Sequence, residues 1–171
     1  MLPGLGGTAY HNTPGGAVEL AVVSAAGLLG PPVVGGIMLV LTRRLNFGRQ
    51  LLIACAALCA YTGFSLAADD FTQLICFCGG VAFGLVGAIR WNFAQSLLVQ
   101  IIAIQLMVES VLDWDYAWIE SFTRDGEVWL SDTGKIAHNI GGTHWFWASV
   151  LCGIIILIVG IAWSYSFRRT G

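Results

Sequence analysis

The side chains of this 171-residue chain that could do chemistry gather between residues 131 and 144. Asp132 offers a carboxylate, and His138 and His144 offer imidazoles, which are oxygen and nitrogen ligands that zinc accepts in proteins. Their spacing is neither a helical i, i+4 pair nor that of a closed zinc site. Ser131 or Asp132 could instead cap a short helix, because a side-chain oxygen at that position accepts an unpaired backbone N–H. The residues alone leave both interpretations open.

A second set of polar side chains recurs at helical spacing. Because a polar group without a partner is costly in lipid, we expect this face to point into a helix bundle. Glu109 is the acid expected to lie deepest, either as a functional intramembrane carboxylate or as one solvated near the interface. The set consists of Asn92, Ser96, Gln100, Gln105, Glu109 and Asp113.

Membrane helices must position these side chains. Hydrophobic residues make up 57% of the chain and charged residues 11%, and the mean hydropathy is +0.77, which is atypical of a soluble domain. We therefore predict an all-α, polytopic membrane helix bundle with about five spans, since roughly 20 apolar residues cross a bilayer. A Gly-rich interfacial loop covers 1–17, where His11 is interpreted as a solvated loop histidine, and 18–171 form a single transmembrane domain. The predicted spans are 18–41, 51–68, 71–89, 92–112 and 145–167, with an outer aromatic and acidic segment at 113–144.

The first span is interrupted by glycine and proline. Proline removes a backbone donor and clashes with the preceding turn, and glycine lets other helices come close. We expect this helix to kink and to lie inside the bundle, where neighbours satisfy the freed carbonyls. The residues concerned are Gly27, Gly30, Pro31, Pro32, Gly35 and Gly36.

Small residues elsewhere in the spans are expected to serve packing. In the third span Gly80, Gly84 and Ala88 recur every four residues, a pattern that allows close helix crossing. The five cysteines all lie in apolar runs without a CxxC pair, which favours packing over disulfides or metal binding. They are Cys55, Cys59, Cys76, Cys78 and Cys152.

The aromatic residues of the outer segment predict a location at the membrane surface. Trp114, Tyr116, Trp118, Phe122 and Trp129 are rings of the kind that settle at headgroup depth. We expect this segment to lie along the outer interface as short helices and turns.

Loop charges predict the orientation, because cytoplasmic loops retain Lys and Arg. With five spans, all the loop arginines before residue 113 fall on the face of the C-terminal Arg168 and Arg169, whereas Asp69, Asp70 and the outer segment fall on the other. We therefore expect the N-terminus outside and the C-terminus in the cytoplasm. The expected location is a bacterial inner membrane. An outside N-terminus without a signal sequence would be natural if one more span preceded Met1. Nucleic acid is not expected as a partner, since no basic patch is present.

Three stretches together resemble a known family. SAAGLLGPPVVGGIMLV at 24–40 is similar to the second conserved helix of the M50B-type membrane metallopeptidases, relatives of the site-2 proteases. SDTGKIAHNIGGTHWFWASV at 131–150 resembles the family's Ser-Asp-Ala stretch before its last span. GLGGTAYHNTPGG, ahead of the first span, resembles its short interfacial loop.

The resemblance implies a membrane-embedded zinc peptidase in which an HExxH helix supplies two histidines and a general base. Asp132 matches the acid of the Ser-Asp element and is carried over as a metal-site or structural acid. This chain contains no HExxH, so we expect it to hydrolyse no peptide and to bind no zinc by itself. Either the HExxH helix precedes Met1 in a longer protein, or the chain is a non-catalytic relative.

The residues are also compatible with two other functions. The chain could be a small transporter or channel subunit, with the polar face at 92–113 lining a hydrated path. It could also be a structural membrane protein that packs against a partner through Gly80, Gly84 and the kinked first span. The expected partners are the lipid bilayer and either a membrane-protein substrate or a partner helix.

Overall fold

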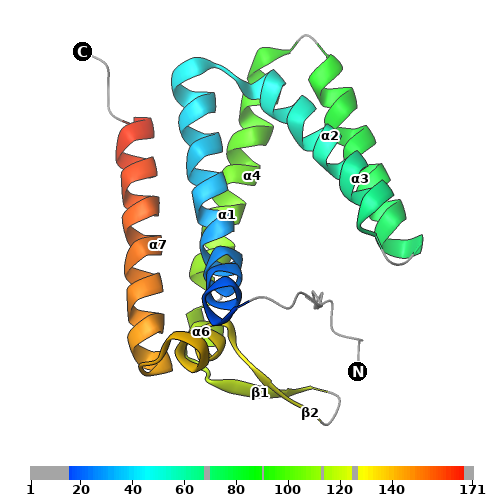
Figure 1. Ribbon diagram of the computed structural model, residues 1–171. Coiled ribbons are helices and arrows are strands. Elements are labelled where there is room, and N and C mark those ends of the chain that lie inside the picture. Colours follow the sequence, from blue (N-terminus) through cyan, green and yellow to red (C-terminus); the bar gives the residue numbers. More distant parts are fainter. Residues whose placement is uncertain (1–15, 68–69, 90, 113, 125–126, 168–171) are drawn as a thin grey trace.

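The computed structural model describes residues 16–67, 70–89, 91–112, 114–124 and 127–167. It shows a helix bundle with one small β-hairpin at one end (Figure 1), so the predicted all-α polytopic fold is confirmed. The loop at 1–15 with His11, and Asp69, Arg90, Asp113, Arg168 and Arg169, lie outside the described residues. The elements are α1 (Ala17–Leu45), α2 (Gly48–Ser65), α3 (Asp70–Ala88), α4 (Asn92–Leu112), α5 (Trp114–Trp118), β1 (Ser121–Arg124), β2 (Glu127–Leu130), α6 (Asp132–Ile140) and α7 (His144–Phe167).

All five predicted spans are helical, and four have the length and composition to cross a membrane. Within the described residues these four are Ala17–Arg43, Asp70–Ala88, Asn92–Trp118 and His144–Ser166. Helix α2 has 18 residues and differs because polar Arg49 and Gln50 lie in its first turn, where they lower its mean hydropathy. It nevertheless packs along α3 as an antiparallel helical hairpin (Figure 1). The second predicted span, 51–68, therefore remains a prediction.

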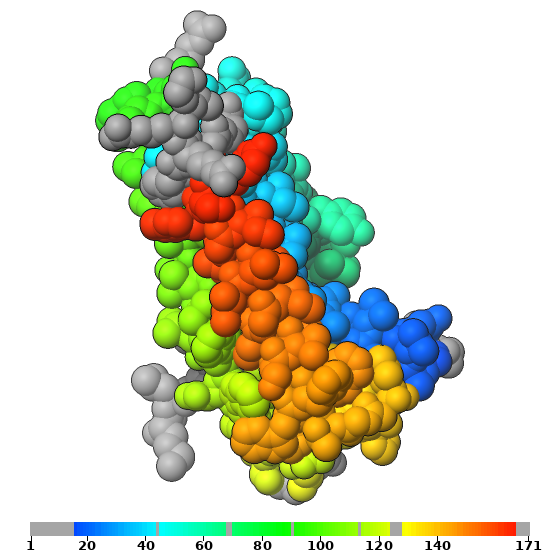
Figure 2. All heavy atoms as spheres, turned by 90° about the vertical axis from the view of Figure 1, so that its left-hand side faces the viewer, coloured from blue at the N-terminus to red at the C-terminus, as the bar shows by residue number. Residues whose placement is uncertain are grey.

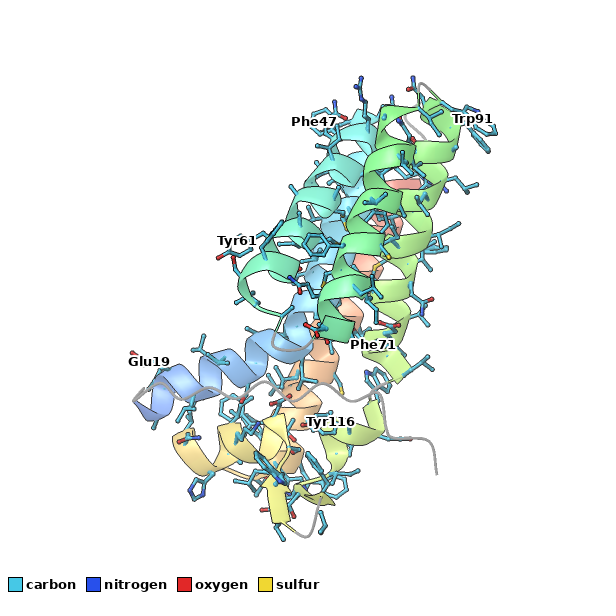
Figure 3. All side chains as sticks on the ribbon, turned by 90° about the vertical axis from the view of Figure 1, so that its right-hand side faces the viewer. Glu19, Phe47, Tyr61, Phe71, Trp91 and Tyr116 are labelled. Carbon is cyan, nitrogen blue, oxygen red and sulfur yellow. The ribbon has the colours of Figure 1, made fainter. Side chains whose placement is uncertain are left out.

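Helix α1 is bent, as its glycines and prolines predict. Figure 3 shows the part that carries Glu19 lying across the direction of the rest of the helix. Pro31 and Pro32 lie inside the helix, and their missing N–H groups leave the carbonyls of Gly27 and Leu28 without their helical donors. The bent part is held by packing, because Ala21 is buried with Ile136 and Leu151. The bend thus places the start of α1 against α6 and α7.

The straight part of α1 packs on α4 through a glycine. A Cβ atom built on Gly35 would lie 2.6 Å from the carbonyl oxygen of Ala103, so only glycine permits this approach of two backbones. Leu39, Val99 and Ala103 are fully buried in the same contact region. Helix α7 lies on the other side of α1 and runs along the face shown in Figure 2, with the outer segment gathered at its beginning.

Small residues also join α2 to α3. A Cβ atom on Gly80 would lie 3.3 Å from the carbonyl oxygen of Ala56, and one on Gly84 would lie 4.0 Å from the Ala56 side chain. The prediction that these glycines allow close helix crossing is confirmed, and their partner is α2 of the same chain.

The outer segment contains a β-hairpin that the prediction of short helices and turns missed. Strands β1 and β2 are antiparallel, with Phe122 opposite Trp129 and Arg124 opposite Glu127. The Asp125-Gly126 dipeptide between them is a strong hairpin signal in the sequence. These two residues themselves lie outside the described part of the chain.

Candidate functional site

Asp132 is the first residue of α6, and the residue before it caps the helix. Ser131 has extended backbone angles, and its Oγ accepts a hydrogen bond from the backbone N–H of Gly134 at 3.0 Å. This satisfies one of the N–H groups that a helix start leaves unpaired. The cap predicted from the sequence is therefore confirmed, and its side chain is that of Ser131, which leaves the Asp132 carboxylate available for other contacts.

Buried hydrogen bonds fix the start of α6 to the rest of the outer segment. The Thr133 hydroxyl donates to the carbonyl oxygen of Ala117 at 2.8 Å and lies 3.0 Å from Ser131 Oγ. The backbone N–H of Ser131 donates to the carbonyl oxygen of Glu120 at 2.9 Å. Both hydroxyl side chains are fully buried, so the position of Asp132 is set by a network that water does not enter.

Helix α1 lies directly across from the Asp132 carboxylate. A Cβ atom built on Gly27 would lie 3.9 Å from Asp132 Oδ2. Gly27 is exposed, and it is the residue whose carbonyl oxygen Pro31 leaves without a helical donor. The bend in α1 and the acid of α6 therefore form one site, in which the Asp132 side chain is partly exposed.

Two further side chains interact with Asp132. The ammonium group of Lys135, one turn along α6, lies 3.5 Å from Asp132 Oδ1, and the two side chains are 42% and 24% exposed. The Tyr116 side chain on α5 (Figure 3) lies close enough to Asp132 to interact with it electrostatically. Sequence analysis missed both residues. The i, i+3 spacing of Asp132 and Lys135 could have predicted the ion pair, whereas no sequence signal connects Tyr116 to this site.

The two described histidines do not join Asp132. His138 is exposed near the end of α6. His144 begins α7, where its Nδ1 lies 3.5 Å from the carboxylate of Glu120. Among the described residues, no three His, Cys, Asp or Glu side chains come together as a metal site would require. These residues therefore do not fit a zinc site on their own.

The polar face of α4 does not point into the bundle as a whole. Gln105 and Glu109 are exposed, and Gln105 Nε2 donates to Glu109 Oε1 at 3.0 Å, so the expectation of an inward face is wrong for both. The two side chains satisfy each other on the outer surface. The buried face of α4 instead carries Val99, Ala103 and Met107, which pack against α1 and α2. Apolar side chains occupy this face because they need no hydrogen-bond partner there.

Gln95, outside the regular polar spacing, is the glutamine with a structural role. It is 2% exposed, and its Nε2 lies 3.1 Å from the carbonyl oxygens of Val86 and Gly87 and 2.7 Å from that of Ile89. The carbonyls of Val86 and Gly87 belong to the last turn of α3, where helical N–H partners run out. Ile89 follows the helix, and its carbonyl oxygen also accepts from the backbone N–H of Trp91 at 2.9 Å. Gln95 therefore ties the end of α3 to the beginning of α4.

Comparison with known proteins gives one match. The model of the Peptidase M50B-like family matches residues 3–163, which is most of the chain and includes both Gly27 and Asp132. No curated protein matches, and no solved structure matches.

Proposed function

Because this chain belongs to the Peptidase M50B-like family, we propose that it forms the acid-bearing part of an M50-type membrane peptidase bundle, in which Asp132 is the metal-site acid. The four long apolar helices make it an integral membrane protein. We further propose that the C-terminus is cytoplasmic, which the loop arginines favour, and that the membrane is a bacterial inner membrane.

The observation that supports this proposal is the contact between Gly27 and Asp132. The resemblance requires the kinked small-residue helix to lie beside the acid, and a separation beyond about 15 Å, more than one helix diameter, would have contradicted it. The distance of 3.9 Å from a Cβ on Gly27 to Asp132 Oδ2 meets this requirement. The Asp132 side chain is partly exposed, which leaves the carboxylate accessible to a further helix.

Zinc, when bound in this family, would supply an activated water, but the described residues hold only one candidate ligand. Asp132 alone cannot hold the ion, and the 171 residues contain no HExxH. We therefore derive no peptide cleavage by this chain as given. Its proposed contribution is to hold one carboxylate rigidly through the Ser131 and Thr133 network, at a site that ligands from outside the chain would complete.

The two rival functions have less support. A transport path along α4 requires Gln105 and Glu109 to face a hydrated cavity, whereas both are exposed on the surface and paired with each other. A partner-binding role for Gly80 and Gly84 requires a free small-residue face, whereas both glycines pack against α2.

The experiment that tests the proposal is to purify the native protein from its own membrane and to measure its intact mass and its zinc content. A mass above the 18.3 kDa of this chain, with zinc that is lost in Asp132→Asn, would support a metallopeptidase with an additional ligand helix. A zinc-free protein of 18.3 kDa would support a non-catalytic relative.

The matched control is Asp115→Asn, because Asp115 is an exposed acid on the neighbouring α5. Zinc retained in Asp132→Asn, or lost equally in both variants, would contradict the proposed role of Asp132.

A further inference from the structure

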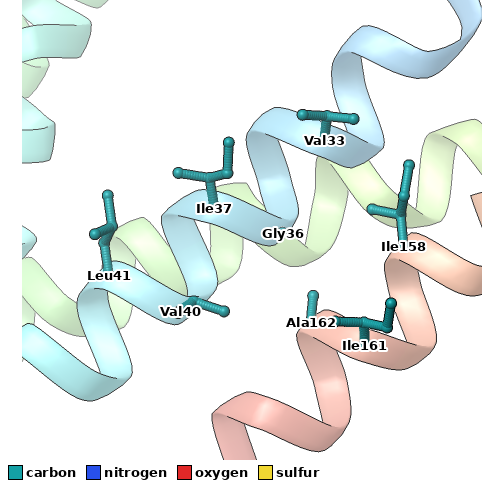
Figure 4. A pocket seen from close by; sticks show the side chains of 8 residues that line it. All are labelled: Val33, Gly36, Ile37, Val40, Leu41, Ile158, Ile161 and Ala162. Atoms are coloured by element: carbon teal, nitrogen blue, oxygen red, sulfur yellow. The ribbon is translucent and has the colours of Figure 1, made fainter.

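An apolar groove runs between α1 and α7, beyond the bend that carries Gly27. Its walls are the aliphatic side chains of Val33, Ile37 and Val40 on α1 and of Ile158 and Ile161 on α7 (Figure 4). The groove has a volume of about 350 Å³, which is within the roughly 300–1,000 Å³ of small-molecule sites.

The floor of the groove is closed by a direct contact between the two helices. A Cβ atom on Gly36 would lie 3.2 Å from the Cβ of Ala162. Small residues would let another helix approach closely, but Gly36 and Ala162 already pack against each other. The rim presents branched side chains, of which Ile37 is 53% and Ile161 56% exposed. Such a rim is too bulky for a close helix but suits a thin, flexible hydrocarbon chain.

We infer that this groove holds one acyl chain of an anionic phospholipid whose phosphate reaches the arginine-bearing end of α1. On α1 the lining runs from Val33 to Leu41, about 12 Å of helix at 1.5 Å per residue. This length accommodates part of an acyl chain. The groove lies within two helices that have the length and composition to cross a membrane, so bilayer lipid is the molecule that surrounds it.

The charge at one end of the groove selects the headgroup. Bilayer hydrocarbon is as apolar as the groove, so apolar contact alone gives no preference for one lipid. Arg43 follows Val40 by three residues and Gly36 by seven, which places it on the same face of α1 as the groove. It is exposed, just beyond Leu41. A guanidinium group there complements a phosphate.

The inference is tested by native mass spectrometry of the full chain in mixed micelles of phosphatidylglycerol and phosphatidylcholine with identical acyl chains. We expect the chain to retain phosphatidylglycerol about fivefold more than phosphatidylcholine, the preference that one arginine near an anionic headgroup gives. Arg43→Gln should abolish this preference. Arg49→Gln should not, because Arg49 is in the first turn of α2, which lies on the side of α1 away from α7 (Figure 1).

Occupation of the groove is tested separately by filling it. Val40→Phe and Ile161→Phe should each lower retention of both lipids, whereas Val34→Phe, at an exposed position of α1 outside the groove lining, should leave retention unchanged. Circular dichroism of each variant verifies its helix content, and two filling variants on different helices guard against a local folding defect. Equal lipid retention by the Phe variants and by the unsubstituted chain would overturn the acyl-chain site. A phosphatidylglycerol preference that remains in Arg43→Gln would overturn the headgroup assignment.

Discussion

A Cβ atom built on Gly27 would lie 3.9 Å from Oδ2 of Asp132, although the two residues belong to helices α1 and α6, which are far apart in the sequence. Two local features produce this contact. Pro31 and Pro32 bend α1 so that its beginning lies against α6, and Ser131 caps α6 so that the carboxylate of Asp132 is left to face α1. The site therefore depends on a helix bend and a helix cap acting together.

The contact predicts a specific cross-link. In a background with the five native cysteines replaced by alanine, the pair Gly27→Cys and Asp132→Cys should be joined by a short bismaleimide in membranes, because the two positions face each other directly. Ile37→Cys with Asp132→Cys is the matched control, since Ile37 lies about 15 Å further along α1. Peptide mass spectrometry identifies the linked residues. Equal cross-linking of the two pairs would contradict the described geometry.

We expect an added side chain at Gly134 to destabilise the start of α6. A Cβ atom there would overlap the carbonyl oxygen of Glu120, and a backbone atom cannot move aside cheaply. Gly134→Ala should therefore lower the free energy of unfolding by about 1–3 kcal/mol, the usual cost of overpacking. Gly160→Ala, in α7, is the control, because no described atom lies within 4 Å of a Cβ at that position. Thermal unfolding in detergent measures both, and an equal melting temperature for the two variants would show that α6 can shift without cost.

We expect replacement of the buried Gln95 to lower stability more than replacement of the exposed Gln105. Gln95→Leu removes the amide donor from the carbonyl oxygens of Val86 and Gly87 at the end of α3, and a buried polar group left unpaired costs about 1–3 kcal/mol. Gln105→Leu removes the same amide from the surface, where substitutions change stability by about 0.5 kcal/mol or less. Thermal unfolding compares the two. A smaller loss for Gln95→Leu than for Gln105→Leu would mean that the end of α3 is not held by this side chain.

Much of the fold could be predicted from the sequence because long apolar runs and their interruptions are local signals. The approximate positions of the long helices, the bend at Pro31 and Pro32 and the cap at Ser131 follow from the residues at those positions. The exact ends do not, since α2 covers Gly48–Ser65 rather than 51–68. The β-hairpin was missed, although Asp125-Gly126 indicated it, since aromatic residues at a membrane surface fit helices and strands equally well.

The orientation of α4 could not be predicted from its polar spacing. Gln105 and Glu109 satisfy each other across one turn, so the helix can turn both outward while Val99 and Ala103 face α1. One of the residues near Asp132, Tyr116, could not be predicted from the sequence either. The electrostatic interaction of Asp132 with Tyr116 depends on how α5 packs beside α6, which is a tertiary relationship without a local signal.

Gly35 predicts the most sensitive contact between α1 and α4. A Cβ atom there would lie 2.6 Å from the carbonyl oxygen of Ala103 and 3.2 Å from the Cβ of Leu106, so Gly35→Ala must push two helix backbones apart. Removing glycine from a helix normally favours the helix by about 0.5–1 kcal/mol, but here overpacking should outweigh this gain and lower the melting temperature. Gly153→Ala, in α7 with no described atom within 4 Å of its Cβ position, should show the gain or no change. A melting temperature for Gly35→Ala at or above that of the unsubstituted protein would mean that α1 and α4 do not pack this closely in the membrane.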